Sequence, residues 1–453
     1  MNFLKAYNHF FEKYFPSPLT ITVGLTLFTF LLAHILSNNE SSLIEYSGTL
    51  AIYWFEGLWQ ENLLAFTIHM MLILVLGHIL ALSKPAQNLI NFGLKFCTNT
   101  ANAAFIITFA TIIVSMFNWG LGLIFGAIFA RKIGEHFQKN ERKLNYPLIG
   151  AAAYVGMMVW HGGLSGSAPL TVAGSNHSLI AEMGMIPIQS TILSVMNLSV
   201  SITLLIVLPI LFYFLGKKSK YASTLKLRYK NVNLKETFHA TPAQKFEQNN
   251  LVGIFIGMMI LLVFIFLGIQ NIQQGGSFLN ILNLQTTNLM LLGLCFLLHG
   301  NIQSLNKALQ DAISGVSGIL IQFPLYFGIM GVMSQSGMVE ILSKSVIQYA
   351  NEFTLPIFTF VSAGLVNIFI PSGGGQWQIQ GPLIAESALN IGVDLPKMVM
   401  ALSYGDQITN MLQPFWALPL LGITGLKAKE ILPYTLLMFL VGSFIFLLGL
   451  IIF

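Results

Sequence analysis

Long apolar runs separated by short polar stretches recur along the whole chain. Runs of about 20 residues, the length that a helix needs to cross a bilayer, occupy 17–37, 62–83, 187–215, 250–270, 311–334 and 430–453. A shorter run covers 286–302, and two long runs at 146–175 and 398–425 are interrupted by polar and glycine-rich stretches. The pattern predicts an all-α polytopic membrane protein with about nine crossings.

Two further apolar stretches, 100–130 and 354–385, are each too long for one crossing and carry a break in the middle. The break is Asn118–Gly122 in the first stretch and Pro371–Gly375 in the second. Glycine and proline destabilise the interior of a helix. We therefore expect two re-entrant helical hairpins, each of which enters and leaves by the same membrane face.

The amino-acid composition excludes several classes of soluble protein. Hydrophobic residues make up 55% of the chain and charged residues only 9%, whereas a soluble domain carries about 25% charged residues. This excludes a soluble enzyme, a secreted domain and a nucleic-acid-binding protein. The two cysteines, Cys97 and Cys295, provide neither a disulfide framework nor a metal-ligand cluster.

The basic residues predict the orientation. With the N-terminus inside and both hairpins re-entrant, 20 of the 22 Lys and Arg residues fall on the inner side. Only Lys344 and Lys397 fall outside, as the positive-inside rule favours. Nine crossings then place the C-terminus outside.

The two halves of the sequence match at an offset of 250 residues. Ala151 and Tyr154 correspond to Ala401 and Tyr404, and the two hairpins fall at nearly the same offset. Each half reads as span, hairpin, broken span and span, but the two sets start on opposite sides of the membrane. Inverted repeats with broken helices are typical of secondary transporters.

The repeat divides the chain into five segments. We expect 100–215 and 354–453, which hold the hairpins and broken spans, to form a transport domain. Segments 1–99 and 250–353 supply scaffold helices, and the basic segment 216–249 is a cytoplasmic linker.

The breaks predict where the chemistry lies. Non-helical backbone at membrane depth is tolerated only where protein or a wet cavity satisfies it. We therefore expect the four breaks to meet at one polar site near the midplane of the membrane. They lie at 118–122, 161–167, 371–376 and 406–413.

No Lys or Arg falls within a predicted span, so an anionic substrate would be held by helix N-termini, hydroxyls and amides. Small apolar parts of a substrate would lie against Trp119, Trp377 or Phe415. The candidate substrate-binding residues are Ser165, Ser167, Ser372, Gly373, Gly374, Gly375, Gln376, Thr409 and Asn410.

Asp406 is the one acid placed deep in a span, a costly position that usually serves function. We expect it to couple transport to H⁺ or Na⁺, with Asn118, His161 and Gln413 as further candidates. Na⁺ would bind Asp406, Asn410 and Asn118, and no other cofactor is expected. The structural alternatives are a plain packing turn at Asn118, a satisfied buried His161 and an Asp406 paired for stability.

Several stretches together resemble the bacterial short-chain fatty acid transporter family. They are Asn118–Gly120, His161–Ser167, Pro371–Gln376 and, most specifically, Gly405–Pro419. The resemblance covers the whole chain and implies uptake of acetoacetate, butyrate and similar monocarboxylates across the bacterial inner membrane. It also implies a mobile transport domain beside a scaffold that forms a homodimer.

The family is similar to a wider ion-transporter superfamily. In dicarboxylate-transporting relatives of that superfamily, Ser-Asn-Thr hairpin tips bind sodium and substrate. This chain has Asn118–Gly120 and Ser372–Gly374 instead, which leaves H⁺ and Na⁺ both open. Two other functions stay open. One is a carrier for another small organic anion, such as a dicarboxylate or an amino-acid conjugate. The other is a channel or an intramembrane enzyme that uses His161 and Ser165.

Overall fold

The computed structural model describes residues 18–37, 42–174, 177, 179–219, 241–276, 278–281, 284–347, 349–371, 373–413 and 415–453. Every element in those ranges is a helix. Ser372, the first 17 residues and most of the linker 216–249 lie outside the described residues.

The helices of the first half are α2 (Pro18–Leu36), α3 (Leu43–Leu58), α4 (Glu61–Leu82), α5 (Lys84–Leu94), α6 (Thr100–Phe117), α7 (Trp119–Lys139), α8 (Tyr146–Tyr154), the 3₁₀ turns η1 (Val155–Met158) and η2 (Trp160–Gly162), α9 (Ser167–Val172), α10 (Ile180–Met183) and α11 (Val195–Lys218). Those of the second half are α12 (Pro242–Glu247), α13 (Asn250–Gln273), η3 (Phe278–Ile281), α14 (Leu284–His299), α15 (Ile302–Ala312), η4 (Ile313–Val316), α16 (Ser317–Gln335), α17 (Met338–Ile347), α18 (Leu355–Asn367), α19 (Gly373–Ile391), α20 (Leu395–Thr409), α21 (Leu418–Thr424) and α22 (Ala428–Ile452).

Seven segments of the described chain are long and apolar enough to cross a membrane: Leu19–Leu36, Leu63–Leu80, Thr100–Phe117, Tyr146–Val172, Val195–Lys218, Asn250–Gln273 and Ala428–Ile452. Six of them lie in the predicted spans, and the seventh is α6, the first arm of a predicted hairpin. The all-helical, multi-pass character is confirmed. The count of nine crossings, the re-entrant path of the hairpins and the sides of the termini stay predictions.

Four helices of ten or more residues lie between the predicted spans in the described chain, namely α3, α5, α15 and α17. They have 16, 11, 11 and 10 residues, each shorter than the length of about 20 residues that identifies a crossing. A search for spans alone therefore does not find them.

Helices α3 and α16 pack very closely, because glycines face each other at the contact. A Cβ on Gly57 of α3 would overlap the carbonyl oxygen of Phe327 and lie 3.0 Å from Cα of Gly331. Small residues at such contacts let helix backbones approach each other, which favours packing in a membrane. This contact joins the first and second halves of the sequence.

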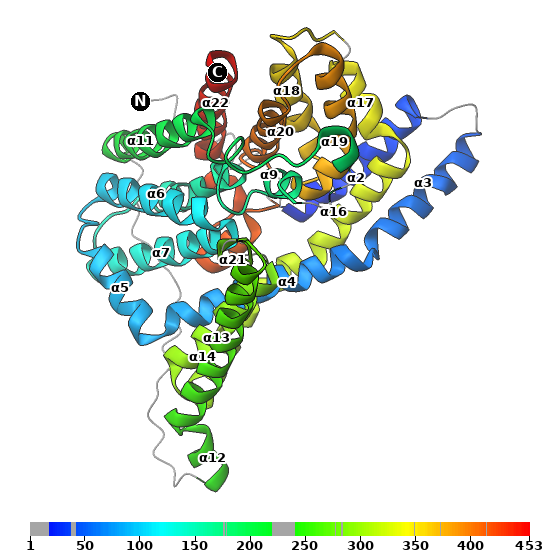
Figure 1. Cartoon of the computed structure of the whole chain (residues 1–453). Coiled ribbons are helices and arrows are strands. Elements are labelled where there is room, and N and C mark those ends of the chain that lie inside the picture. The colour runs from blue at the N-terminus through cyan, green and yellow to red at the C-terminus, as the bar shows by residue number, and fades with distance from the viewer. Residues whose placement is uncertain are drawn as a thin grey trace.

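The helices form two contact groups (Figure 1). In one group α16 packs on α2, α3 and α4, and α4 packs on α14, which lies along α13 in a projecting arm. In the other group α6 packs on α7, α8 and α11, while α20 packs on α18 and α19. These groups follow the predicted scaffold and transport segments, although that division stays a prediction.

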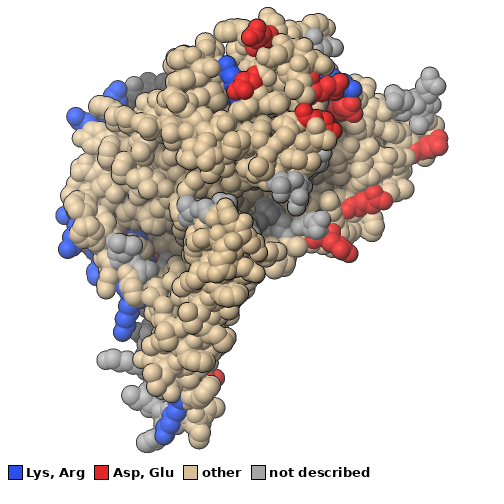
Figure 2. All heavy atoms as spheres, in the orientation of Figure 1, with Lys and Arg blue, Asp and Glu red and all other residues tan. Residues whose placement is uncertain are grey.

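Charge is unevenly distributed over the surface (Figure 2). Lys and Arg lie mostly over the side of α5 and α7, at the end of α11 and near the tip of the arm, whereas most Asp and Glu lie over the side of α3 and α17. Between them the surface is largely uncharged, and α13 exposes Leu251, Phe255, Leu262 and Phe266. Such an apolar band is suited to contact with lipid.

Candidate functional site

The first broken span loses its regular α-helix after Tyr154, before the expected break at 161–167, and stays irregular up to Ser167. Helix α8 gives way to η1 and η2, and the chain re-enters a helix only at α9. The N–H of Leu164 donates to the carbonyl of Met116 at the end of α6, at 2.7 Å. The break is therefore satisfied by protein and lies against the first hairpin.

The second broken span is interrupted between α20 and α21, and the second hairpin between α18 and α19. The sequence predicted that Gly373–Gly375 would precede a helix. In the structure these glycines form the first turn of α19, since glycine tolerates helical geometry at an end where few contacts are lost. The first-turn N–H groups of a helix have no partner within the helix itself.

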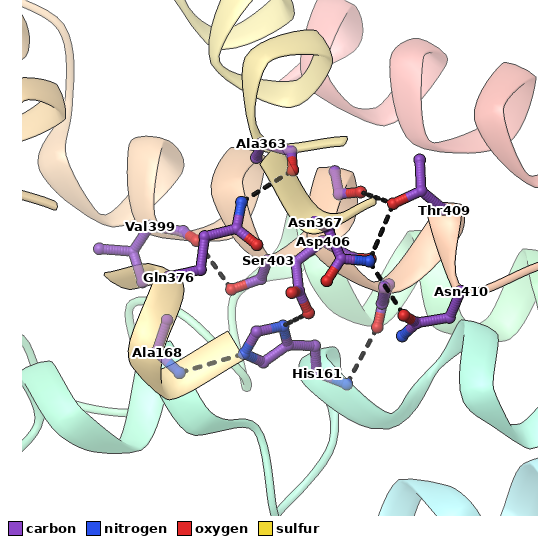
Figure 3. Close-up of polar contacts among 12 residues, drawn as sticks. His161, Ala168, Ala363, Asn367, Gln376, Val399, Ser403, Asp406, Thr409 and Asn410 are labelled. Atoms are coloured by element: carbon purple, nitrogen blue, oxygen red, sulfur yellow. Dashed lines mark hydrogen bonds and ion pairs between the residues drawn. The ribbon is translucent and has the colours of Figure 1, made fainter. Parts of the chain in front are cut away.

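His161 and Asp406 form a buried pair (Figure 3). Nδ1 of His161 lies 3.0 Å from Oδ2 of Asp406, and the side chains are 0% and 1% exposed. Neither oxygen of Asp406 forms a hydrogen bond among the described residues, so the two side chains are in close contact without a well-aligned hydrogen bond. Two residues that sequence reasoning assigned to ion coupling are thus in direct contact.

The backbone determines which nitrogen of His161 carries the proton. Its Nε2 accepts a hydrogen bond from the N–H of Ala168, in the first turn of α9, at 3.1 Å. A nitrogen that accepts from an N–H has a free lone pair, so the proton of the neutral ring sits on Nδ1, facing Asp406. The backbone N–H of His161 donates to Oε1 of Gln407 at 2.9 Å, which holds the residue to α20.

The glycine-rich start of α19 lies directly against this pair. A Cβ on Gly373 would overlap Cε1 of His161 and lie 3.2 Å from Oδ2 of Asp406. A Cβ on Gly374 would meet Cβ of Ser167 at an ordinary 3.6 Å. The second hairpin and both broken spans therefore meet here.

Asn367, at the end of α18, is a site residue that sequence reasoning missed. It is fully buried, and its amide nitrogen lies 2.7 Å from the carbonyl oxygen of Asp406 and 2.9 Å from both Oγ1 of Thr409 and Oδ1 of Asn410 (Figure 3). Gln413 donates to the carbonyl oxygen of Asn367 at 3.0 Å. The repeat offset of 250 carries Asn118 to position 368, one residue away, and could have indicated Asn367.

Several amide groups of this cluster keep unused hydrogen-bonding atoms. Oδ1 of Asn367, Nδ2 of Asn410 and Oε1 of Gln413 are buried without a partner among the described residues. Buried polar atoms without a protein partner are costly, and a bound ligand, an ion or water would satisfy them.

At the tip of the first hairpin, the polar groups of Asn118 and Trp119 have hydrogen-bond partners within the protein. The side chain of Asn118 accepts from the N–H of Leu121 at 3.0 Å and so caps α7, while the N–H of Trp119 donates to Oγ of Ser165 at 3.0 Å. No described contact joins Asn118 to Asp406. The predicted grouping of Asn118 with Asp406 and Asn410 is therefore not seen as a contact, although its role stays a prediction.

The amide of Gln376 points to α18 rather than to Asp406. It donates to the carbonyl oxygen of Ala363 at 2.8 Å and to Oε1 of Gln380 at 2.7 Å. Its side chain ties the two arms of the second hairpin together.

Aromatic rings surround the site. Trp160 stacks on His161 with centroids 4.2 Å apart, and Trp119 lies between Trp160, at 5.8 Å, and Trp416, at 4.9 Å. Phe415 stacks on Phe323 of α16 at 4.2 Å. Of the three predicted apolar contacts, Trp119 and Phe415 belong to this group, and Trp377 is buried in a separate cluster with α18 and α20.

The geometry does not arrange His161 and Ser165 as a base and a nucleophile. One imidazole nitrogen faces Ala168 and the other faces Asp406, while Ser165 accepts from Trp119. A base needs a nitrogen within hydrogen-bond reach of the hydroxyl that it activates.

Comparison with known proteins bears on the kind of site. Residues 2–453 match the model of the family described as "Short chain fatty acid transporter". Two similar proteins bear the name "Putative short-chain fatty acid transporter". The one from Escherichia coli is 34% identical over 98% of both chains, and the one from Haemophilus influenzae is 34% identical over 97% of both.

The crystal structure of the Alcanivorax borkumensis YdaH transporter aligns with 96% of this chain and 98% of its own, at 15% identity and a TM-score of 0.43. The family match and the two relatives confirm the resemblance seen in the motifs. The family and both relatives are described as transporters rather than enzymes. The chain belongs to the short-chain fatty acid transporter family.

Proposed function

We propose that this protein carries short-chain monocarboxylates, such as acetoacetate and butyrate, across the bacterial inner membrane by secondary active transport coupled to H⁺ or Na⁺. The observation that carries the proposal is the buried contact of His161, Asp406 and Gly373, where three interrupted segments meet. Family membership supports the substrate class.

The substrate carboxylate would bind at the first turn of α19, where the N-terminus of a helix favours an anion. Ser167 lies beside Gly374. Thr409 and Asn410 accept hydrogen bonds from the amide of Asn367, which also contacts the backbone of Asp406. Ser165 and Ser372 complete the proposed set, and the aromatic rings of Trp119 and Phe415 would limit the length of the acyl chain. His161, Asp406, Gln413 and Asn118 would form the coupling set.

Movement of one helix group against the other would expose the site to alternate sides. The order of elements supports an inverted repeat, because α4 to α9 are followed, at offsets of 249 to 256 residues between their first residues, by α16 to α21. The helices α2, α3, α4, α13, α14 and α16 would form the scaffold and the contact between two copies in a homodimer.

A dicarboxylate or an amino-acid conjugate is a weaker candidate. A second negative charge calls for a cation, and the described contacts of His161, Asp406, Gly373 and Asn367 include no Lys or Arg. Burying an unpaired charge is costly.

The test is uptake of labelled acetoacetate into proteoliposomes that contain the purified protein, with protein-free liposomes as control. Acetoacetate is preferred because it crosses bare lipid less readily than butyrate. We expect saturable uptake that unlabelled butyrate inhibits and succinate does not. Uptake that only succinate inhibits would favour the dicarboxylate carrier.

A further inference from the structure

Asp406 occupies the position that an anionic ligand would take. Its carboxylate lies against the first residue of a 19-residue helix, α19, and is 1% exposed. Apart from His161 at 3.0 Å, no hydrogen-bond donor meets it among the described residues. The protein thus presents its own carboxylate where the proposed function places that of the substrate.

Two carboxylates cannot both be ionised at this buried helix end. Like charges a few ångströms apart repel much more strongly in a buried site of low dielectric than in water. Among the described residues no Lys or Arg contacts Asp406 to offset that repulsion. A substrate anion therefore requires that the charge of Asp406 be removed first.

His161 is poorly placed to take a second proton. A proton on Nε2 would face the N–H of Ala168, which donates to that nitrogen at 3.1 Å. Protonated Asp406, in contrast, keeps Oδ2 in contact with Nδ1 of His161 at 3.0 Å and carries its own proton on Oδ1. The carboxyl group is therefore the proton carrier, and His161 is a positioning residue.

Other titratable groups lie away from Asp406. Among the elements packed on α20, α18, α9 and η1 have none, η2 has only His161, and α19 has Glu386, 13 residues beyond Gly373. In α22 the groups are Lys429, Glu430 and Tyr434, all near its start. On α20 itself, Tyr404 donates to Asn197, and Lys397 lies in the first turn.

We propose that one proton on Asp406 accompanies each monocarboxylate anion, so that the coupling ion is H⁺ and the transported pair is neutral. The proton binds Asp406 from one side of the membrane, the substrate carboxylate takes the place of the lost charge at α19, and both leave on the other side. This proposal rests on the proposed function and selects between its two coupling ions.

The experiment measures accumulation of labelled acetoacetate in proteoliposomes under separately imposed gradients. For one-to-one coupling, an interior more alkaline by about one pH unit drives about tenfold accumulation. A Na⁺ gradient at equal pH is expected to drive none, and a K⁺ diffusion potential of either sign should leave the uptake unchanged. Accumulation driven by Na⁺, or by the potential alone, would overturn the proposal.

The variant Asp406→Asn should abolish the tenfold accumulation and retain only slower counterflow that no longer varies with pH. Asp394→Asn, which removes an exposed acid at the start of the same helix, is the matched control and should behave as the wild type. Accumulation by Asp406→Asn would refute the proposal. The wild-type gradient tests decide it even where the variant does not fold.

His161→Gln keeps an acceptor for Ala168 but loses the donor to Asp406, whereas His161→Asn keeps a donor near the Nδ1 position. We expect the first to shift the pH profile of accumulation and the second to restore it. A lower rate with an unchanged profile would show that His161 is only structural. If wild-type protein shows no counterflow of any short-chain monocarboxylate, the proposed function itself fails.

Discussion

The two hairpin tips occupy matching places in the sequence but differ in how their polar groups are satisfied. At the first tip Asn118 caps α7 and Ser165 accepts from Trp119. At the second tip Asn367, Asp406 and Gln413 keep buried atoms without hydrogen-bond partners among the described residues. At the first tip the amide of Asn118 is used as a helix cap, whereas the polar groups beside the second tip keep unpaired atoms where we propose that the substrate binds.

The largest expected effect is from Gly373→Ala in the second tip. The added methyl group overlaps His161, so the tip must move away from Asp406. We expect uptake to fall about 100-fold, since displacing a binding group by about 1 Å causes losses of that order. Proteoliposome uptake measures it, and Gly374→Ala, whose methyl fits at 3.6 Å from Ser167, is the control. Equal losses in both variants would mean that the glycines serve only general packing.

The next effect compares the two asparagines directly. Asn367→Ala leaves the partners of a buried amide unpaired and should lower the free energy of unfolding by about 1–3 kcal/mol. Asn118→Ala removes a helix cap and should cost about 1 kcal/mol. Thermal unfolding in detergent measures both. We expect transport to fail in Asn367→Ala. Full coupled transport by Asn118→Ala would remove Asn118 from the proposed coupling set and sharpen the contrast between the tips, whereas a matching failure would remove that contrast.

The smallest effect concerns His136 near the end of α7, in the first half. Burial, and then the positive charges of Arg142 and Lys139, lower its pKa below 6.5. The unfolded chain therefore binds the proton more readily, so stability falls as pH drops through about 6.5 toward the folded pKa. His136→Gln should flatten this pH dependence of the unfolding temperature and leave proton-driven accumulation intact. An unchanged slope would exclude His136 as its source.

The helix breaks could be predicted from the sequence because glycine, proline and polar residues stand out in apolar runs. The structure interrupts helices at Asn118, after Tyr154, after Asn367 and after Thr409, within or beside the expected breaks. The short helices α5 and α15 could not be found by span length, because each has 11 residues.

The contacts between residues of the site were harder to predict from the sequence. His161 and Asp406 are 245 positions apart, and no spacing rule connects residues on two separate broken helices. Asn367 was missed since a single asparagine at the end of an apolar run resembles an ordinary helix cap. Its importance comes only from the three oxygens that packing places around its amide nitrogen.

Phe415 follows Asp406 by nine positions, yet its ring lies on Phe323 and Tyr326 of α16. An aromatic pair contributes about 0.5–1.5 kcal/mol beyond its buried area. In the proposed cycle, moving the segment after α20 against α16 would unstack these rings and so add a modest barrier to each turnover. The proposed proton carrier and the residue that sets this barrier would then lie nine positions apart, so that substitutions in this segment would affect both coupling and turnover rate.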